Sequence, residues 1–499
     1  MKYIFREKIY LTFVITITCF LTYLVFWSGH HYSIDGIVMF NYAKALIFQH
    51  SWVMSPPIHW NGMDISVSKW AIGMSLAYVP LLWFFAGTIF RYHPGYTNIP
   101  YDPSIEFNSQ LLQNTSYLSV SLLNPLFTAI TAGLSFIFVQ ELGFTKRQAI
   151  AISLIYGVLS PAAVYAKFDY SQPLSSLFLL LSIILLNHGV INFKYTYLVG
   201  AGISLGLSAL ARTEIGLMTY PVIVLALIWN NNLLRNHDNF DLLRSLSAFS
   251  IPIILMMTVT QFINYQRFHS LTAVGYNFGN DFGIDIIKFV KAFWGNLFSP
   301  GRGLFIHFPL ALLTLVVIPK IHKKFVYVVV AGLLVISLIF YSCWVEWSGG
   351  ISWGPRFMIP FLPYWTILGF IGYNKLKSHR QAIAKYLLVI TTFIGGIFTT
   401  QGLLFNFLDF YSKLQLSTEQ IVKGNYNFQI ASSPIFADWS KLFQPQEYDI
   451  FWIQSYSHWK GSIKWWLIIT VISLAIITSL WLIYLFHNEN GETSKVSKH

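Results

Sequence analysis

The chain has 499 residues, of which 55% are hydrophobic and only 10% are charged, and its mean hydropathy is +0.56. Such a composition excludes an ordinary soluble globular protein and indicates a polytopic membrane protein. The formal net charge is +12, so a nucleic-acid-binding protein has to be considered. Both cysteines, Cys19 and Cys343, fall in apolar segments, which argues against a disulfide framework or a Cys-based metal site.

Apolar stretches recur along the chain, and about twelve of them are long enough to cross a bilayer as helices. We therefore expect an all-α polytopic bundle. The expected crossings are Ile9–Trp27, Tyr117–Glu141, Gln148–Ala166, Pro173–Val190, Thr196–Ala211, Ile215–Trp229, Leu246–Ile263, Leu304–Pro319, Phe325–Trp344, Phe357–Tyr373, Tyr386–Phe405 and Trp465–Phe486. Lys2, Arg6 and Lys8 precede the first apolar run, and no small-residue cleavage site follows it, which is typical of a retained anchor.

The distribution of charge predicts the orientation of the bundle. With both termini in the cytoplasm, the inner loops carry a clear excess of Lys and Arg, whereas the outer loops are nearly balanced. This is the positive-inside pattern, and it leaves no basic surface for nucleic acid. The apolar segment Trp70–Phe90 would invert the pattern if it crossed. We therefore expect it to lie along the interface or to dip in and return, with Pro80 at a bend.

The expected organisation has four parts: a transmembrane module over 1–405, an outer-face cap over 406–462, a last transmembrane helix over 463–486 and a cytoplasmic tail over 487–499. The first outer loop, 28–116, is expected to contain interfacial helices. The tail is polar, and we expect it to be disordered.

Asp35 is the central candidate in the first outer loop. Ser33 is expected to cap a helix that places Asp35 in its first turn, where the helix dipole favours negative charge. A helix-start residue would need no other role. However, acids immediately outside a membrane span are often functional in polytopic proteins. Lys69 lies in a turn of the same loop, just before its apolar segment.

The next outer loops are short and polar. One contains Asp169 and Tyr170, and Asp169 is either a solvated turn acid or part of the same site. The following tight turn contains Arg212 and Glu214, which form either a plain ion pair or one side of a site for an anionic ligand.

Two glycine-rich outer loops each contain an arginine. Pro300-Gly-Arg302-Gly is a turn in which backbone N–H groups and a guanidinium can converge on a phosphate. The loop that ends at Arg356 contains Trp347 and Trp353, whose rings suit sugars or lipid. An aromatic belt at the membrane surface would explain the tryptophans, but not the glycines beside both arginines.

The order of these motifs resembles the GT-C superfamily of membrane glycosyltransferases. The shared features are an Asp after the first span, the Ser68-Lys69-x-x-x-Gly73 step and a short acidic second outer loop. Patterns similar to Phe298-Ser-Pro-Gly-Arg-Gly303 and Trp347-Ser-Gly-Gly-Ile-Ser-Trp-Gly-Pro-Arg356 recur in bacterial phospholipid-carrier-dependent, dolichyl-phosphate-mannose-like transferases. The likeness extends from Met1 to about Tyr373. Many relatives have a second acid after the first-loop Asp, where this chain has Gly36, and this weakens the case for a metal there.

The resemblance implies an inverting transfer of a sugar from a polyprenyl-phosphate donor to a hydroxyl of a cell-envelope glycan or glycolipid. The site would face outward from the bacterial inner membrane. Asp35 would be the general base. The donor phosphate would bind Lys69, Arg302, Arg356 and Arg212. The candidates for contacts with the acceptor, the sugar or a metal are Asp169, Tyr170, Glu214, Trp347, Trp353 and His269.

No cofactor is firmly implied. A divalent cation held by His30, His31, His59 or His269 together with Asp35 or Asp169 stays open. Two other functions also stay open. A transporter or flippase of a lipid-linked glycan would suit the number of spans, but no charged residue lies in mid-span and no internal repeat is evident. A glycan polymerase or ligase would use a lipid-pyrophosphate donor.

Overall fold

A computed structural model describes residues 2–60, 63–85, 120–233, 241–270, 282–283, 285–317, 325–437 and 439–454. In these ranges the regular structure is almost entirely helical, which confirms the expected all-α polytopic class. The one strand pair described is a short antiparallel hairpin of β1 (Ile58–Trp60) and β2 (Met63–Ile65), in which His59 lies opposite Asp64.

Seven described helices are long and apolar enough to cross a membrane, or up to eight if one bent pair forms a single span. The seven are α1 (Lys2–Val25), α5 (Leu123–Glu141), α8 (Gln172–Asn192), α10 (Thr213–Leu233), α11 (Leu242–Phe268), α15 (Phe325–Ser342) and α17 (Gln381–Leu404). The bent pair is α6 (Lys146–Val158) and α7 (Pro161–Lys167), which meet at 49°. The expected count of about twelve crossings is therefore not confirmed.

Some expected crossings are short or broken. Thr196–Ala211 corresponds to α9 (Tyr195–Ala211), Leu304–Pro319 to α14 (Leu304–His307) and the 3-10 helix η4 (Pro309–Val316), and Phe357–Tyr373 to the 3-10 helix η6 (Arg356–Phe361) and α16 (Leu362–His379). Pro309 and Pro360 contribute to the breaks because proline has no backbone N–H to donate. The expected crossing Trp465–Phe486 and the tail 487–499 lie outside the described residues.

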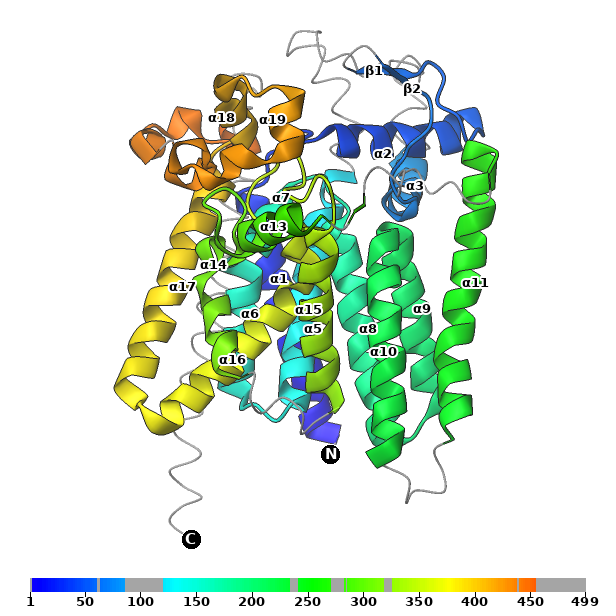
Figure 1. The fold of residues 1–499 in the computed structure, drawn as a ribbon, viewed down its shortest axis with the longest axis vertical. Helices are drawn as coiled ribbons and strands as arrows, with labels where there is room; N and C mark the ends of the chain where they lie inside the picture. Colours follow the sequence, from blue (N-terminus) through cyan, green and yellow to red (C-terminus); the bar gives the residue numbers. More distant parts are fainter. Residues whose placement is uncertain are drawn as a thin grey trace.

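The long helices run side by side, and α2 (Ile34–Lys44) lies across one end of the bundle (Figure 1). We call this the loop end; the first residues of α1 lie at the opposite end (Figure 1). A π-helical turn, η1 (Ala45–Gln49), continues α2. The expected cap at Ser33 is confirmed, because its side chain accepts a hydrogen bond from Gly36 N.

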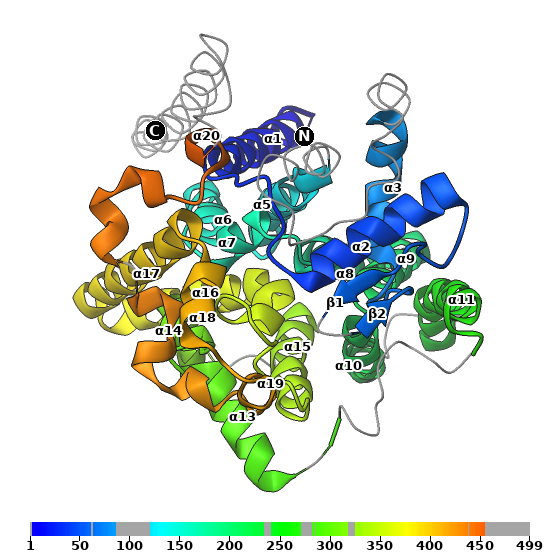
Figure 2. The ribbon, with the colours of Figure 1, turned by 90° about the horizontal axis from the view of Figure 1, so that it is seen from above.

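The expected interfacial segment contains α3 (Gly73–Phe85), which packs against α2 at the loop end (Figures 1 and 2). Pro80 lies inside this helix. With 13 residues, α3 is shorter than a span requires. Trp83 and Phe84 near its C-terminus are exposed, as expected of side chains that face lipid. The continuation of the segment after Phe85 lies outside the described residues.

The C-terminal segment covers part of the loop end (Figure 1). We call its described residues, 406–454, the cap. It consists of α18 (Phe407–Leu414), α19 (Thr418–Lys423), the 3-10 turns η7 (Asn425–Phe428), η8 (Ile430–Ser432), η9 (Pro434–Phe436), η10 (Trp439–Phe443) and η11 (Pro445–Glu447), and α20 (Phe451–Gln454). The cap returns to the end of α1, where Phe451 N donates to Trp27 O at 2.7 Å. A further helix, α13 (Ile286–Phe298), contacts it through Lys291 Nζ, which donates to Lys423 O at 2.8 Å.

Glycines allow the closest helix contacts in the core. A Cβ on Gly372 of α16 would lie 1.9 Å from the carbonyl oxygen of Leu313 in η4, far inside van der Waals contact. A Cβ on Gly202 of α9 would lie 2.2 Å from Phe249 O in α11. The pairs α16–η4 and α9–α11 therefore depend on the missing side chains.

We expect Gly372→Ala to lower the thermal unfolding midpoint, because the new methyl group forces α16 away from a backbone atom that cannot give way. Overpacking of this kind costs about 1–3 kcal/mol. Gly200→Ala is the matched control, since a Cβ there meets only the end of the Leu185 side chain, at 3.2 Å. Equal midpoints for both variants in detergent would contradict this description of the α16–η4 contact.

Candidate active site

The loop between α7 and α8 is the element on which the site is built. We call residues Lys167–Gln172 the connector. Asn124, in the first turn of α5, is buried and donates its amide hydrogens to Phe168 O at 2.6 Å and Tyr170 O at 2.7 Å. Buried backbone carbonyls need hydrogen-bond partners. Because Asn124 supplies the partner for two of them, it holds the connector backbone in one conformation.

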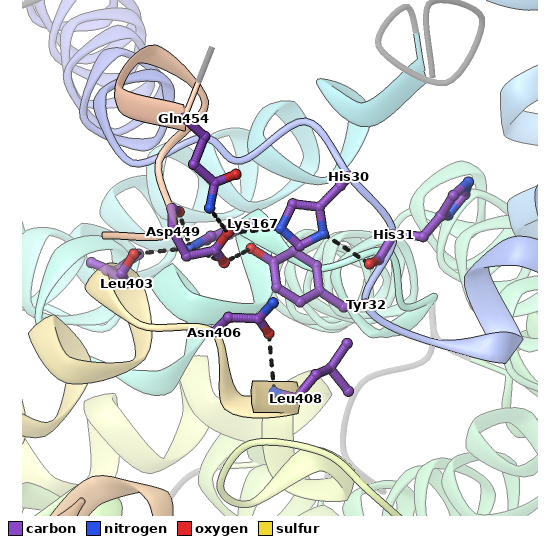
Figure 3. Close-up of polar contacts among 9 residues, drawn as sticks. All are labelled: His30, His31, Tyr32, Lys167, Leu403, Asn406, Leu408, Asp449 and Gln454. Atoms are coloured by element: carbon purple, nitrogen blue, oxygen red, sulfur yellow. Dashed lines mark hydrogen bonds and ion pairs between the residues drawn. The ribbon is translucent and has the colours of Figure 1, made fainter. Parts of the chain in front are cut away.

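Lys167 joins the connector to the cap through a buried ion pair (Figure 3). Its ammonium lies 2.8 Å from Asp449 Oδ2, and both side chains are 1% exposed. The same ammonium donates to Leu403 O at 3.0 Å and to Asp449 O at 2.5 Å. Burial of a charge is costly unless it is paired and hydrogen-bonded, and the Lys167 ammonium meets both conditions.

The Asp449 carboxylate also holds the start of the first loop (Figure 3). His30 Nε2 lies 2.7 Å from Asp449 Oδ1, Tyr32 Oη donates to Oδ2, and Gln454 Nε2 donates to Oδ1 at 3.2 Å. Burial alone would raise the pKa of Asp449, but the charges of Lys167 and His30 more than offset this and hold it well below its usual range. The carboxylate is therefore ionised and fully hydrogen-bonded, which suits a structural role.

Asp169 is the second acid of the site and is also fully buried. His31 Nδ1 lies 2.8 Å from Asp169 Oδ2, and Ser33 Oγ donates to Oδ1 at 3.0 Å. A Cβ on Gly36 would lie only 1.9 Å from Asp169 Oδ2. The carboxylate of Asp169 thus fills the space that a side chain at position 36 would need, so an acid at position 36 and Asp169 in this place exclude each other.

Asp35 forms an ion pair with Arg356, which begins η6. The two side chains are 13% and 12% exposed. Arg356 lies over the ring of Tyr170, with 4.0 Å from the guanidinium carbon to the ring centre, and donates to Gly349 O at 3.0 Å. Burial opposes the Arg356 charge, but the Asp35 carboxylate outweighs it and the pKa of Arg356 is raised.

Gln172, the last residue of the connector, joins Arg356 to Arg212. Its side-chain oxygen accepts from Arg212 Nη1 at 2.7 Å and from Arg356 Nε at 3.1 Å, in the amide orientation that hydrogen bonding requires. Arg212 Nη2 lies 2.5 Å from Glu214 Oε1, which also accepts from Tyr341 Oη at 3.3 Å. The expected Arg212–Glu214 pair is thus present, and it belongs to the same polar cluster as Asp35.

Arg302 holds the loop that contacts Arg356. Its guanidinium donates to Ser348 O at 2.8 Å and to Gly350 O at 2.7 Å. Arg356 donates to the carbonyl oxygen of Gly349, the residue between them. Further bonds go to Gly301 O at 2.9 Å, Tyr411 Oη at 2.9 Å and Tyr426 Oη at 3.3 Å. Arg302 is 1% exposed. Its hydrogen-bond donors are therefore occupied by the Ser348–Gly350 loop, by Gly301 and by the cap.

The other expected site residues lie outside this cluster. Lys69 is exposed, and its ammonium lies over the ring of Trp70 at 5.2 Å. His269 is the exposed residue that ends α11. Trp353 is fully buried and donates through Nε1 to Gln401 Oε1 at 3.0 Å. Trp347 is buried against Gly295 of α13 and Phe428 of the cap. Both tryptophans pack between elements and present no open ring face.

The histidines considered for a metal are dispersed. His30 and His31 pair with Asp449 and Asp169, and His59 forms an exposed pair with Asp64 in the hairpin. Across the described ranges no three His, Cys, Asp or Glu side chains are placed to hold one metal ion.

An apolar groove begins within one helical turn of Glu214. It has a volume of about 540 Å³ and lies between α10 and α11. Its lining consists of Gly216, Leu217, Tyr220, Pro221, Ile253, Ile254, Met257, Thr258 and Gln261. The polar cluster and a mainly hydrophobic groove are therefore neighbours along α10.

Several residues that build the site or its surroundings were not selected from the sequence. Gln172 follows Asp169 in the connector, but a single amide in a short loop carries no signal. Lys167 and Asp449 are separated by 282 positions and meet only through the fold. Arg267 was also missed: it is buried, and its guanidinium donates to Trp70 O at 2.8 Å and to Ser68 O, thereby anchoring the Lys69 turn. A charged residue at the last turn of an apolar helix was the available signal for Lys167 and Arg267.

Comparison with known proteins gives a distant structural likeness. No protein-family model and no curated protein sequence matches the chain. The chain aligns over 94% of its length with two crystal structures of ArnT from Cupriavidus metallidurans, and covers 77% of each. One is bound to undecaprenyl phosphate (TM-score 0.49, 12% identity) and the other is in the apo state (TM-score 0.48, 14% identity). At such values the function has to be argued from this chain's own residues.

We expect Lys167→Met to lower the thermal unfolding midpoint strongly, because it leaves the buried Asp449 carboxylate without its ammonium. Removal of one partner of a buried pair costs about 3–5 kcal/mol. The double variant Lys167→Met/Asp449→Leu should recover part of the loss. Lys423→Met is the control, since it breaks an exposed pair with Glu419 and should leave the midpoint almost unchanged. A loss no larger than that of the control would contradict a structural role for the Lys167–Asp449 pair.

The His30–Asp449 contact predicts a pH dependence of stability. Burial lowers the pKa of His30, but the charge and hydrogen bond of Asp449 more than offset this, so the pKa is raised. A raised histidine pKa adds stability that is complete below the unfolded value of about 6.5 and is lost as the pH rises through the folded value. The midpoint difference between wild type and His30→Gln should therefore shrink as the pH rises above about 6.5. A difference that grows with pH would contradict the contact.

Proposed function

We propose that this chain is an inverting glycosyltransferase of the GT-C type, which moves a sugar from a polyprenyl-phosphate donor to a hydroxyl acceptor. The observation that carries the proposal is the cluster at the loop end, where the Asp35 carboxylate pairs with the largely buried guanidinium of Arg356, and Gln172 joins Arg356 to a second largely buried guanidinium, that of Arg212. A base and a cationic site for a phosphate are the groups that this reaction needs.

In the proposed reaction, the acceptor oxygen attacks the anomeric carbon as Asp35 takes its proton. The bond between that carbon and the phosphate oxygen breaks, and its electron pair leaves with the polyprenyl phosphate. Attack from the face opposite the leaving group inverts the configuration. Arg356 and Arg212 would stabilise the charge that develops on the phosphate. Asp35 is paired with Arg356 before the donor binds, so the phosphate would replace Asp35 at that guanidinium and release the base.

The groove between α10 and α11 supports a donor with a long apolar chain. Leu217, Ile253 and Met257 offer hydrocarbon surface, and the groove starts within one turn of Glu214, which pairs with Arg212. A polyprenyl chain in this groove would carry its phosphate toward the arginines.

The expected phosphate-binding residues take different parts in the proposal. Arg356 and Arg212 would contact the phosphate directly. Arg302 would hold the Ser348–Gly350 loop and so position Arg356, because its donors are bound to that loop and to the cap. Lys69 would have no direct part, since it is exposed beside Trp70. Asp169 and Tyr170 would shape the space next to Asp35 and contact the acceptor or the sugar.

We place the enzyme in a bacterial inner membrane with both termini in the cytoplasm and the loop end outside. The support is the excess of Lys and Arg in the loops that the sequence assigns to the cytoplasmic side. The acceptor would be a cell-envelope glycan or glycolipid, because a lipid-linked donor at this face meets acceptors of the envelope.

We expect Asp35→Asn to lower transfer by about 100-fold or more, the usual contribution of a general base. The measurement is sugar transfer by purified protein in proteoliposomes that contain a polyprenyl-phosphate donor and a glycolipid acceptor. Loss of the base should lower kcat, while the protein still inserts and purifies normally.

Asp64→Asn is the matched control, because Asp64 is an exposed acid of the same loop that pairs with His59. It should transfer at the wild-type rate. Full activity of Asp35→Asn would show that Asp35 is not the general base. Movement of the intact donor lipid across the membrane, with its sugar–phosphate bond unbroken, would identify a flippase instead.

A further inference from the structure

A continuous row of side chains crosses the candidate active site. Asp35 pairs with Arg356, Arg356 donates to Gln172, Gln172 accepts from Arg212, and Arg212 pairs with Glu214. An acid closes the row at each end, and the amide stands between the arginines. Two like charges are thereby held within hydrogen-bond reach of one oxygen atom.

The amide oxygen of Gln172 makes this arrangement stable. Guanidiniums have donors only, so two of them side by side need an acceptor between them. The distances of 2.7 Å to Arg212 Nη1 and 3.1 Å to Arg356 Nε are those of ordinary hydrogen bonds. Gln172 is fully buried, so water cannot take over this contact at its side chain.

The fold sets the position of Gln172 independently of the arginines. Gln172 is the first residue of α8, and Pro173 follows it in the same turn. The preceding backbone is fixed by Asn124 through its bonds to Phe168 O and Tyr170 O. The backbone that bears the Gln172 amide is therefore held in place. Arg356 and Arg212, which come from other elements, meet at this amide.

We infer that Gln172 is a positioning residue, which holds Arg356 and Arg212 side by side as a single fork that binds a phosphate. A neutral acceptor is important for this role. A carboxylate at position 172 would also join the guanidiniums, but it would cancel part of their charge. The amide satisfies the same donors and leaves the positive charge available for the ligand. The identity of the phosphate, a polyprenyl phosphate, rests on the proposed function.

The test is the isosteric variant Gln172→Glu, because it separates binding from stability. The carboxylate can still accept from both guanidiniums, and its charge attraction to them offsets the loss of the amide N–H donor, so the thermal unfolding midpoint should stay close to that of the wild type. Its negative charge, however, repels a phosphate at the same place. Binding of undecaprenyl phosphate to the protein in nanodiscs should weaken at least about tenfold, since like-charge juxtaposition costs more than 1.4 kcal/mol. In transfer assays the donor KM should rise and the acceptor KM should not.

Gln401→Glu is the matched control. Gln401 is also buried and accepts from Trp353 Nε1 at 3.0 Å, but it lies outside the row and donates to Pro434 O at 2.7 Å. This variant loses that donor, so its midpoint should fall while its affinity for undecaprenyl phosphate stays the same. If Gln172 served packing alone, Gln172→Glu would behave like Gln401→Glu. Its midpoint would fall, and its affinity for undecaprenyl phosphate would stay at the wild-type value.

Wild-type affinity in a stable Gln172→Glu protein would overturn the inference, and so would the absence of undecaprenyl phosphate binding by the wild type. The binding assay requires no sugar transfer. If Asp35→Asn retained full activity while Gln172→Glu still lost affinity, the proposed base would be wrong and the phosphate-binding fork would stand.

Discussion

The buried ion pair between Lys167 and Asp449 is the interaction on which the loop end depends. It fixes the last residue of α7 to the cap and to the end of α17, and through His30 and Tyr32 it holds the chain that leaves α1. The connector starts at this point. Asp169, Tyr170 and Gln172 are then placed by their distance along a short and rigid loop. Asp169 contacts His31 and Ser33 of the first loop, whereas Tyr170 and Gln172 contact Arg356. One loop therefore positions polar groups from several elements of the site.

The charges of the site compensate one another before any ligand is present. Arg356 is flanked by Asp35 and the face of Tyr170, Arg212 by Glu214, and Asp169 by His31 and Ser33. Isolated charges would be too costly in a largely buried place, and paired charges with hydrogen bonds are tolerated. In the proposed reaction, a phosphate would therefore meet a preorganised site and would only have to replace Asp35 at Arg356. Preorganisation of this kind is the main source of electrostatic stabilisation in enzymes.

The sequence predicts the helical class, most helix positions and the cap at Ser33, because apolar length and capping residues are local signals. The expected crossing Leu304–Pro319 does not anticipate the break between α14 and η4, although Pro309 stands at that break. Asp35, Arg356, Arg212, Glu214, Asp169 and Tyr170 were all selected from the sequence and lie together. Lys69, His269, Trp347 and Trp353 were selected by the same reasoning and lie elsewhere. Composition and loop position identify residue types that suit a site, but Gln172 and the Lys167–Asp449 pair depend on contacts between distant segments.

A structure of the full chain in nanodiscs with undecaprenyl phosphate bound would test the proposed site most directly. We predict that the phosphate lies against the guanidiniums of Arg356 and Arg212, that the lipid chain follows the groove between α10 and α11, and that Asp35 is released from Arg356. A phosphate bound elsewhere on the protein, with the Asp35–Arg356 pair intact, would contradict the proposed site.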